Sequence, residues 1–234
     1  MSDLDGRVLL VTGAAGSLGA AVATAGHGAG ARLALLDRDA DGLARVVPEA
    51  SGIVRVTCPD LGQRDAARAA VATVIDRFGR LDAVVATIGG FHAGPGVAEE
   101  GWAPFDLMID ANLRPTVTLL AAALPHLTAP GGRVVTVGAR PALSAPAGMA
   151  AYAAAKAGVV RLTEAVGAEH AERGITANCV LPSILDTPAN RAAMPQADFA
   201  RWVTPAALAD VILFLVSERS RAISGAAIPA YGRA

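Results

Sequence analysis

Two side chains in the second half of the chain have the types and spacing that acid–base chemistry requires. Tyr152 and Lys156 lie four residues apart in an apolar segment with helical spacing, so both project from one face of the expected helix, about one turn apart. An ammonium group near a phenol stabilises the phenolate and lowers the pKa of tyrosine from its ordinary value of about 10. The pair therefore predicts a phenol that donates or accepts a proton.

The use of basic residues supports a functional role for this pair. Lys156 is the only lysine among the 20 Lys and Arg residues, and the chain has two tyrosines. A compact ammonium with a tunable pKa can serve a site that a guanidinium cannot. The alternative is a helix tyrosine with a solvated hydroxyl beside a solvated lysine, and the single lysine favours the functional interpretation.

These two residues need a scaffold, and the pattern of elements indicates an α/β fold. Short β-branched runs alternate with segments of helical spacing such as 66–78, 106–124, 150–171 and 205–216. The expected strands are 7–11, 32–36, 53–57, 83–87, 133–137, 175–181 and 226–229. Alternating units of this kind predict one domain, 1–234, with a Rossmann-type doubly wound sheet of about seven parallel strands and helices on both faces.

Composition excludes several classes of function. The 234 residues have a formal net charge of −1 and no basic run, so we expect no nucleic-acid partner. We see no signal-peptide pattern, and Gly, Pro or charge interrupts every apolar run before about 18 residues, so we expect no membrane partner and a cytoplasmic protein. Cys58 and Cys179 are interpreted as buried apolar residues, and the dispersed histidines indicate no metal site.

A glycine-rich turn follows the first expected strand. Residues 12–19 read Thr-Gly-Ala-Ala-Gly-Ser-Leu-Gly, and glycines at such a turn let the backbone approach a pyrophosphate at a helix N-terminus. A plain turn needs glycine too, but the position after strand one favours a dinucleotide site. Its predicted residues are Gly13, Gly16, Ser17, Leu18 and Gly19.

Acidic residues after the second and third strands define the expected adenosine end of this site. Asp37 lies where a carboxylate accepts hydrogen bonds from a ribose diol and repels a 2′-phosphate, which favours NAD, whereas the adjacent Arg38 is compatible with NADP. Asp60, with Leu61, is a candidate for the adenine pocket. A solvated loop carboxylate is the alternative for Asp60.

In this order and spacing the residues resemble the short-chain dehydrogenase/reductase family along essentially the whole chain. The turn is similar to the family's TGxxxGxG, residues 152–156 match its YxxxK, and Asn112 lies in the helix where the family keeps an Asn. The resemblance implies a dinucleotide-binding part in 1–90 and a catalytic and substrate-binding part in 91–234. It also implies that Lys156 holds the nicotinamide ribose and, together with the positive ring of the oxidised nicotinamide, lowers the pKa of Tyr152, and that Asn112 fixes a water behind Lys156. Pro182 and Thr187 lie where the family's loop after strand six closes on the nicotinamide, and Thr87, Gly89 and Ile184 are further cofactor-binding candidates.

The departures from the family pattern are equally informative. Ser17 replaces a glycine of the turn, residues 86–89 read Ala-Thr-Ile-Gly in place of NNAG, and Ala139 stands where the catalytic Ser is expected, with Ser144 the nearest hydroxyl. The quinonoid dihydropteridine reductases, one branch of the family, also use Tyr and Lys with a small residue in place of this Ser, are similar in residues 181–191, and favour NADH. This resemblance implies reduction of a C=N or quinonoid group, or of a C=O group. The glycine turn is instead closer to that of ordinary short-chain dehydrogenases.

The loops 89–101, 138–148 and 182–202 are expected to form the substrate pocket for a small molecule. Candidate substrate contacts are His92, Ala139, Ser144 and Trp202; His92 could equally be solvated, and Phe91 or Trp202 could line a pocket for a flat ring or serve as a lid or subunit contact. Two other functions stay open, a non-redox enzyme such as a cyclase or isomerase and a nicotinamide-binding module. By resemblance we also expect a homodimer or homotetramer.

Overall fold

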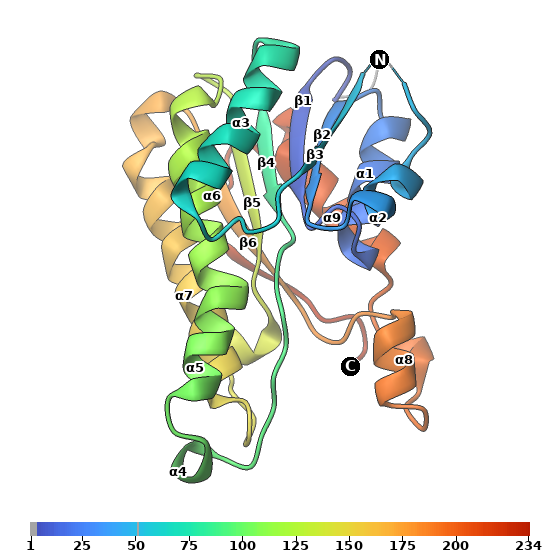
Figure 1. The fold of residues 1–234 in the computed structure, drawn as a ribbon, viewed down its shortest axis with the longest axis vertical. Helices are drawn as coiled ribbons and strands as arrows, with labels where there is room; N and C mark the ends of the chain where they lie inside the picture. The colour runs from blue at the N-terminus through green and yellow to red at the C-terminus, as the bar shows by residue number, and fades with distance from the viewer. Residues whose placement is uncertain (1–3, 51) are drawn as a thin grey trace.

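In a computed structural model of the protein, residues 4–50 and 52–234 form a parallel sheet covered by helices on both faces, as the sequence predicts (Figure 1). The strands are β1 (Val8–Thr12), β2 (Arg32–Asp37), β3 (Ile53–Thr57), β4 (Ala83–Ala86), β5 (Arg133–Val137), β6 (Thr176–Pro182) and β7 (Ala227–Ala230). Their spatial order is β3-β2-β1-β4-β5-β6-β7, with every neighbouring pair parallel. The order reverses between β1 and β4, and ligands of open α/β sheets bind beyond the carboxyl ends of the strands at such a point.

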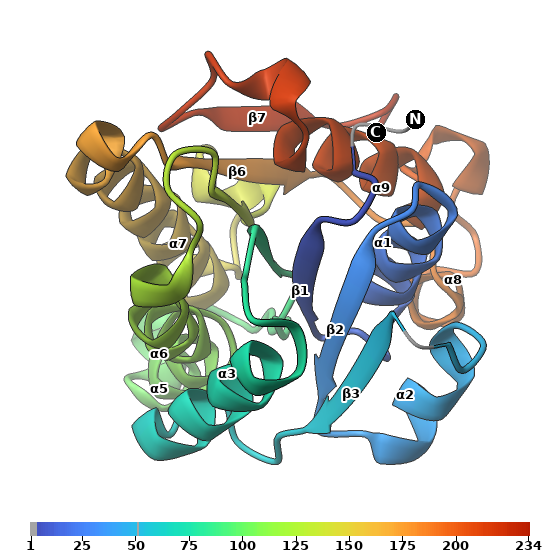
Figure 2. The same ribbon diagram turned by 90° about the horizontal axis from the view of Figure 1, so that it is seen from above.

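Two helical layers enclose the sheet (Figure 2). One contains α1 (Ser17–Gly28) and α9 (Pro205–Val216), and the other contains α3 (Arg64–Phe78), α6 (Arg114–Ala123) and α7 (Ala150–Glu169). The shorter helices are α2 (Ala40–Val46), α4 (Val97–Glu100), α5 (Ala103–Met108) and α8 (Pro188–Ala193). The two layers let the sheet bury apolar side chains on both faces.

Alternation along each strand divides the core into two parts. Leu9 and Val11 of β1 pack toward α1 and α9, whereas Val8 and Leu10 pack toward α3 and α6. Side chains of successive strand residues point to opposite faces, so a strand that is apolar throughout is covered by a helical layer on both faces of the sheet. Cys58 and Cys179 are both free and buried, as expected.

One long apolar helical stretch among the described residues belongs to the second helical layer. α5, a π-helical turn at Ile109–Leu113 and α6 belong to a helical stretch, Ala103–His126, whose most apolar window has a mean hydropathy of 1.2. By length and composition it could cross a membrane, but 44% of that window is buried inside the protein. Leu119 and Leu120 of α6 are part of the core beneath the sheet.

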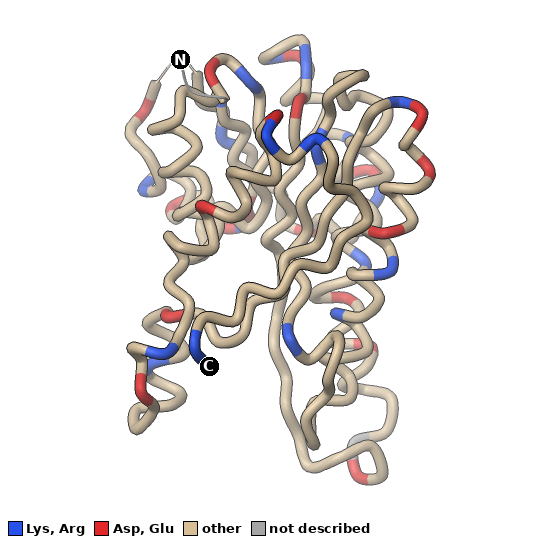
Figure 3. Tube along the Cα trace, turned by 180° about the vertical axis from the view of Figure 1, so that it is seen from behind, with Lys and Arg blue, Asp and Glu red and all other residues tan. Residues whose placement is uncertain are grey.

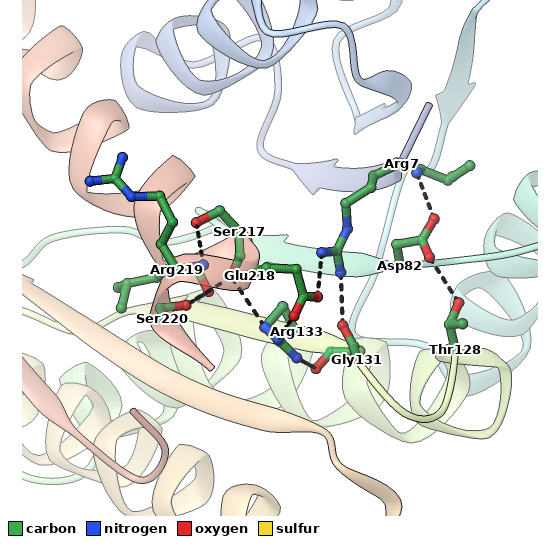
Figure 4. A network of polar contacts seen from close by, with 12 residues as sticks. Arg7, Asp82, Thr128, Gly131, Arg133, Ser217, Glu218, Arg219 and Ser220 are labelled. Atoms are coloured by element: carbon green, nitrogen blue, oxygen red, sulfur yellow. Dashed lines mark hydrogen bonds and ion pairs between the residues drawn. The ribbon is translucent and has the colours of Figure 1, made fainter. Parts of the chain in front are cut away.

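Ion pairs and hydrogen bonds join several segments at the amino ends of the strands. Lys and Arg alternate with Asp and Glu over the surface (Figure 3). At the amino ends of the strands, the guanidinium groups of Arg7 and Arg133 both bond to Glu218, at 2.9 and 3.2 Å (Figure 4). Nearby, buried Asp82 accepts hydrogen bonds from the backbone of Val8 and from Arg80 and Thr128. These intramolecular contacts tie the amino ends of β1, β4 and β5 to one another and to the segment that follows α9.

At the opposite end, two segments extend beyond the carboxyl ends of the strands (Figure 1). One includes α4 and the adjoining end of α5, and the other includes α8. The expected loop 89–101 thus contains a one-turn helix, and the expected loop 182–202 contains α8. α8 was not predicted because its six residues include no apolar periodicity, although Thr187 and Pro188 form a regular helix start.

Candidate active site

The glycine turn leads from β1 into α1, and its conformation requires glycine at some of its positions. Gly13 has a φ of +63°, and a Cβ there would lie 3.0 Å from the hydroxyl of Thr87. A Cβ on Gly19 would lie 2.2 Å from the carbonyl oxygen of Gly13, so both positions need glycine. Ser17 is exposed at the first position of α1, which explains why this departure from the family pattern is tolerated. Leu18 is buried and holds the turn on the core.

A cleft of about 580 Å³ opens beside this turn. It brings together predicted residues from four segments of the chain, after β1, β2, β3 and β4. Its lining includes Gly13, Gly16, Asp37, Arg38, Asp60, Leu61, Thr87 and Gly89. It also includes residues that the motif spacing did not indicate, among them Asp39, Cys58 and Ile88. The N-terminus of α1 carries no side-chain cap, so its backbone N–H groups and the helix dipole favour an anion at this position.

The two acidic residues expected at the adenosine end have different surroundings. The carboxylate of Asp37 accepts hydrogen bonds from the backbone N–H groups of Ala15, at 3.0 Å, and Asp39, at 3.1 Å, so it fixes the turn while lining the cleft. Asp60 accepts from the backbone of Gly62 and the side chain of Gln63, at 2.8 and 3.1 Å. Asp60 therefore stabilises its own turn, and its contact with adenine stays a prediction.

Thr87 belongs to the segment that stands in place of the family's NNAG, and it links two strands. Its hydroxyl donates to the carbonyl oxygen of Thr12 at 2.6 Å and so joins the ends of β4 and β1. The hydroxyl of Thr12 is itself buried, and the described residues offer it no hydrogen-bond partner. A buried polar group without a partner is uncommon in proteins, and here it lies at the head of the glycine turn.

Lys156 and Tyr152 both project from the first turns of α7. The Lys156 ammonium donates to the carbonyl oxygen of Val137 at 2.9 Å, at the end of β5, and lies 6.0 Å from the centre of the Tyr152 ring. Burial lowers the pKa of Lys156 to about 8. Burial raises the pKa of Tyr152 to about 12 in the protein without cofactor, whereas the expected lowering applies when an oxidised nicotinamide lies beside the phenol and stays a prediction. In the protein by itself, desolvation of the phenolate outweighs attraction by an ammonium 6.0 Å from the ring.

Asn112 lies in the π-helical turn, where it bonds to the loop after β4. Its amide nitrogen donates to the carbonyl oxygens of Met108 and Gly90, at 3.0 and 3.2 Å, and its amide oxygen accepts from the backbone N–H of Gly90, at 3.2 Å. A Cβ on Gly89 would lie 2.8 Å from the Asn112 oxygen and 2.9 Å from the Lys156 nitrogen. Asn112, Gly89 and Lys156 therefore converge, while a water fixed by Asn112 stays a prediction.

The loop after β5 offers no hydroxyl at the position of the family's Ser. Ala139 is buried with extended backbone at the start of this loop, and Ser144 is exposed five residues later. The residue that contacts the phenol ring of Tyr152 is Phe91, which belongs to the loop after β4. The ring of Phe91 contacts the ring of Tyr152 edge-on, with centroids 5.1 Å apart. His92 is partly buried next to it.

The loop after β6 is held by the segment that follows β7. Ser183 donates its hydroxyl hydrogen to the carbonyl oxygen of Tyr231 at 2.6 Å. The Thr187 hydroxyl caps α8 by accepting a hydrogen bond from the backbone N–H of Asn190. This bond uses the same hydroxyl that is predicted to contact the nicotinamide. Trp202 is buried against Phe199, which places it in the packing of this loop; its predicted contact with substrate is untested. Pro182 is buried and Ile184 partly buried.

Comparison with known proteins places this arrangement in a family. Residues 13–232 match the family model described as enoyl-(acyl carrier protein) reductase. The chain is 31% identical to an L-fucose dehydrogenase from Oryctolagus cuniculus, over 92% of this chain and 80% of that one. It is 30% identical to a 3-oxoacyl-[acyl-carrier-protein] reductase from Thermotoga maritima, over 96% of each.

Solved structures agree with the sequence comparison. The crystal structure of a 3-ketoacyl-(acyl-carrier-protein) reductase from Brucella melitensis, complexed with NADH, superposes with a TM-score of 0.86 at 26% identity and covers 98% of both chains. The fold and the Tyr–Lys site thus define an oxidoreductase of the Rossmann type. The chain belongs to the short-chain dehydrogenase/reductase family.

Proposed function

We propose that this protein is an NAD(P)H-dependent reductase, with NADH preferred, that acts on a C=N or quinonoid group or on a C=O group. The observation that carries the proposal is the Tyr152–Lys156 pair, fixed at the carboxyl end of β5. A phenol whose pKa is raised to about 12 is protonated at neutral pH, which is the form that a reduction requires. Tyr152 then gives its proton to the nitrogen or oxygen of the reduced group.

The residues of the cleft suit a dinucleotide. Gly13 leaves space that a Cβ would fill, and the N-terminus of α1 favours the charge of a pyrophosphate. By resemblance, Lys156 would hold the nicotinamide ribose, and Pro182, Ile184 and Thr187 would cover the nicotinamide. When bound, the nicotinamide supplies the hydride. Lys156 keeps its orientation through Val137, so its ammonium can stabilise negative charge that develops on Tyr152.

The preference for NADH is supported by two carboxylates at the adenosine end. Asp37 and Asp39 both line the cleft, and the exposed Arg38 lies between them in sequence. Their charges would repel a 2′-phosphate and one of them could bind a ribose diol. Initial rates with NADH and NADPH at equal concentrations test this, and a higher kcat/KM with NADPH would contradict it.

Ala139 supports the preference for C=N and quinonoid substrates. One missing donor to a developing oxyanion costs about 10²–10³ in rate, so a simple ketone loses more than a group whose nitrogen takes the proton directly. We expect NADH oxidation with quinonoid dihydropterin to be faster than with simple ketones. Efficient reduction of ketones with no activity on dihydropterins or imines would contradict this preference, and no dependence on nicotinamide would support a non-redox enzyme.

We further propose a homo-oligomer that uses the face of α5 and α6. Leu107 and Val117 are 56% and 42% exposed on these helices, and Trp102 is 78% exposed at the start of α5. All three side chains belong to one helical stretch, and exposed apolar surface can mark a protein contact. Light scattering on the wild type and on Leu107→Glu tests this proposal: the wild type is expected as a dimer or tetramer and the variant as a smaller species. A monomeric wild type would contradict it.

A further inference from the structure

An exposed aromatic ring lies beside the proton donor of the site. The side chain of Phe91 is 63% exposed, yet its ring contacts the ring of Tyr152 at a centroid distance of 5.1 Å and an interplanar angle of 78°. Tyr152 is partly buried and projects from α7, whereas Phe91 belongs to the loop after β4. The edge-on contact is a favourable geometry for two aromatic rings, and it leaves much of the Phe91 surface in solvent.

The backbone on both sides of Phe91 is fixed. Before it, Gly90 makes two hydrogen bonds with the amide of Asn112, one as donor and one as acceptor, both at 3.2 Å. After it, Gly94 donates its N–H to the carbonyl oxygen of Gly148 at 2.9 Å, just ahead of α7. A Cβ on Gly148, whose φ is +74°, would lie 2.4 Å from the carbonyl oxygen of Gly94. The close approach of these two loops therefore depends on glycine.

Fixation of the loop makes the Phe91 ring a preformed surface. A phenylalanine side chain has two χ angles, so it loses little conformational entropy when a ligand covers it. Water is displaced from apolar surface at the same time, which favours binding. A rigid flat surface stacks well with another flat ring and poorly with a bulky saturated one. These properties match a recognition surface more closely than a mobile lid.

We propose that Phe91 is the specificity-determining platform of the active site and selects substrates whose reducible group is part of a planar, conjugated ring. The inference rests on the proposed function, because it concerns the substrate of the same site. A ring stacked parallel to Phe91 lies nearly perpendicular to the ring of Tyr152. The in-plane lone pairs of a ring nitrogen or carbonyl oxygen are then the atoms available to the phenol, and no other proton donor is needed at Ala139.

The test uses two rigid 1,2-diketones of similar size, acenaphthenequinone, which is flat, and camphorquinone, which is bulky and aliphatic. We expect Phe91→Ala to lower kcat/KM for the flat diketone about tenfold relative to the bulky one, because stacking is lost. Phe91→Tyr should keep the preference. Phe214→Leu removes a partly buried aromatic ring near the end of α9, where its recorded contact is with Arg219, and should change neither value.

A binding measurement distinguishes failure of the Phe91 proposal from failure of the proposed reductase function. Calorimetry measures the affinity of each diketone for the NAD⁺-saturated protein, with no turnover required. A flat-ring preference that is present in the wild type and lost in Phe91→Ala supports the platform even if neither diketone is reduced, in which case the reductase proposal fails for this substrate class. Equal losses for both diketones would show that Phe91 only supports Tyr152. Three outcomes would overturn the proposal: equal losses of affinity for both diketones, no effect of Phe91→Ala on either affinity, or no binding of acenaphthenequinone to the wild type.

Discussion

Replacement of Lys156 by Met should abolish activity and stabilise the protein in the absence of cofactor. Lys156 is 4% exposed, and burial holds its pKa at about 8 instead of 10.5. A pKa difference of this size corresponds to about 3 kcal/mol of destabilisation below pH 8. Met has a similar shape, but it leaves the carbonyl oxygen of Val137 without the ammonium it binds at 2.9 Å, which costs about 1–2 kcal/mol. The net gain is about 1–2 kcal/mol.

Thermal unfolding without cofactor measures this gain. For a chain of this length, about 1–2 kcal/mol raises Tm by roughly 2–8 °C. The pH dependence follows from the sign of the pKa change: an unfolded lysine binds its proton more tightly than the buried Lys156, so the wild type gains stability relative to the variant as pH rises from about 8 toward 10.5. A wild type at least as stable as Lys156→Met at pH 7, with a difference that does not change up to pH 10, would refute the reasoning.

Further predictions concern other parts of the protein. Ala139→Ser should restore a hydroxyl donor and raise kcat for simple ketones about tenfold or more with little effect on quinonoid dihydropterin; an equal change for both substrates would contradict it. Asp37→Ser should shift the ratio of kcat/KM for NADH to NADPH toward NADPH by about tenfold or more, because a repulsive charge is removed; an unchanged ratio would contradict it. Asp82→Ala should cost about 2–3 kcal/mol, since it leaves the backbone N–H of Val8 buried without its acceptor. Asp110→Ala, which breaks an exposed ion pair with Arg114, should lower the free energy of unfolding by only about 0.5 kcal/mol or less. Denaturant titration of both variants measures the two costs, and equal costs would contradict this difference.

Much of the fold could be predicted because strands and glycines leave local signals. The expected strands 53–57 and 133–137 agree with β3 and β5 at both ends, and the other strands differ by at most one residue at each end. Buried parallel strands appear as short β-branched runs, and the right-handed crossover rule then restricts the topology. The positions of Gly13 and Gly19 followed from the backbone geometry that a tight turn requires.

The parts that could not be predicted depend on contacts between distant segments. The π-helical turn around Asn112 has no local sequence signal, because the side chain that bonds to Gly90 is 22 positions away. The contact of Phe91 with Tyr152 joins the loop after β4 to α7 in the same way. The rise of the Tyr152 pKa in the protein without cofactor could not be predicted either, because spacing on a helix indicates a neighbouring charge but not the depth of burial.

The most direct test of the central claim follows NADH absorbance with purified protein and quinonoid dihydropterin, alongside panels of imines and ketones, in the wild type and Tyr152→Phe. The account predicts NADH oxidation by the wild type and loss of nearly all of it in Tyr152→Phe, with NADH affinity retained. Tight binding of NADH without turnover on any substrate, or turnover that survives Tyr152→Phe, would contradict the assignment of Tyr152 as the proton donor of a reductase.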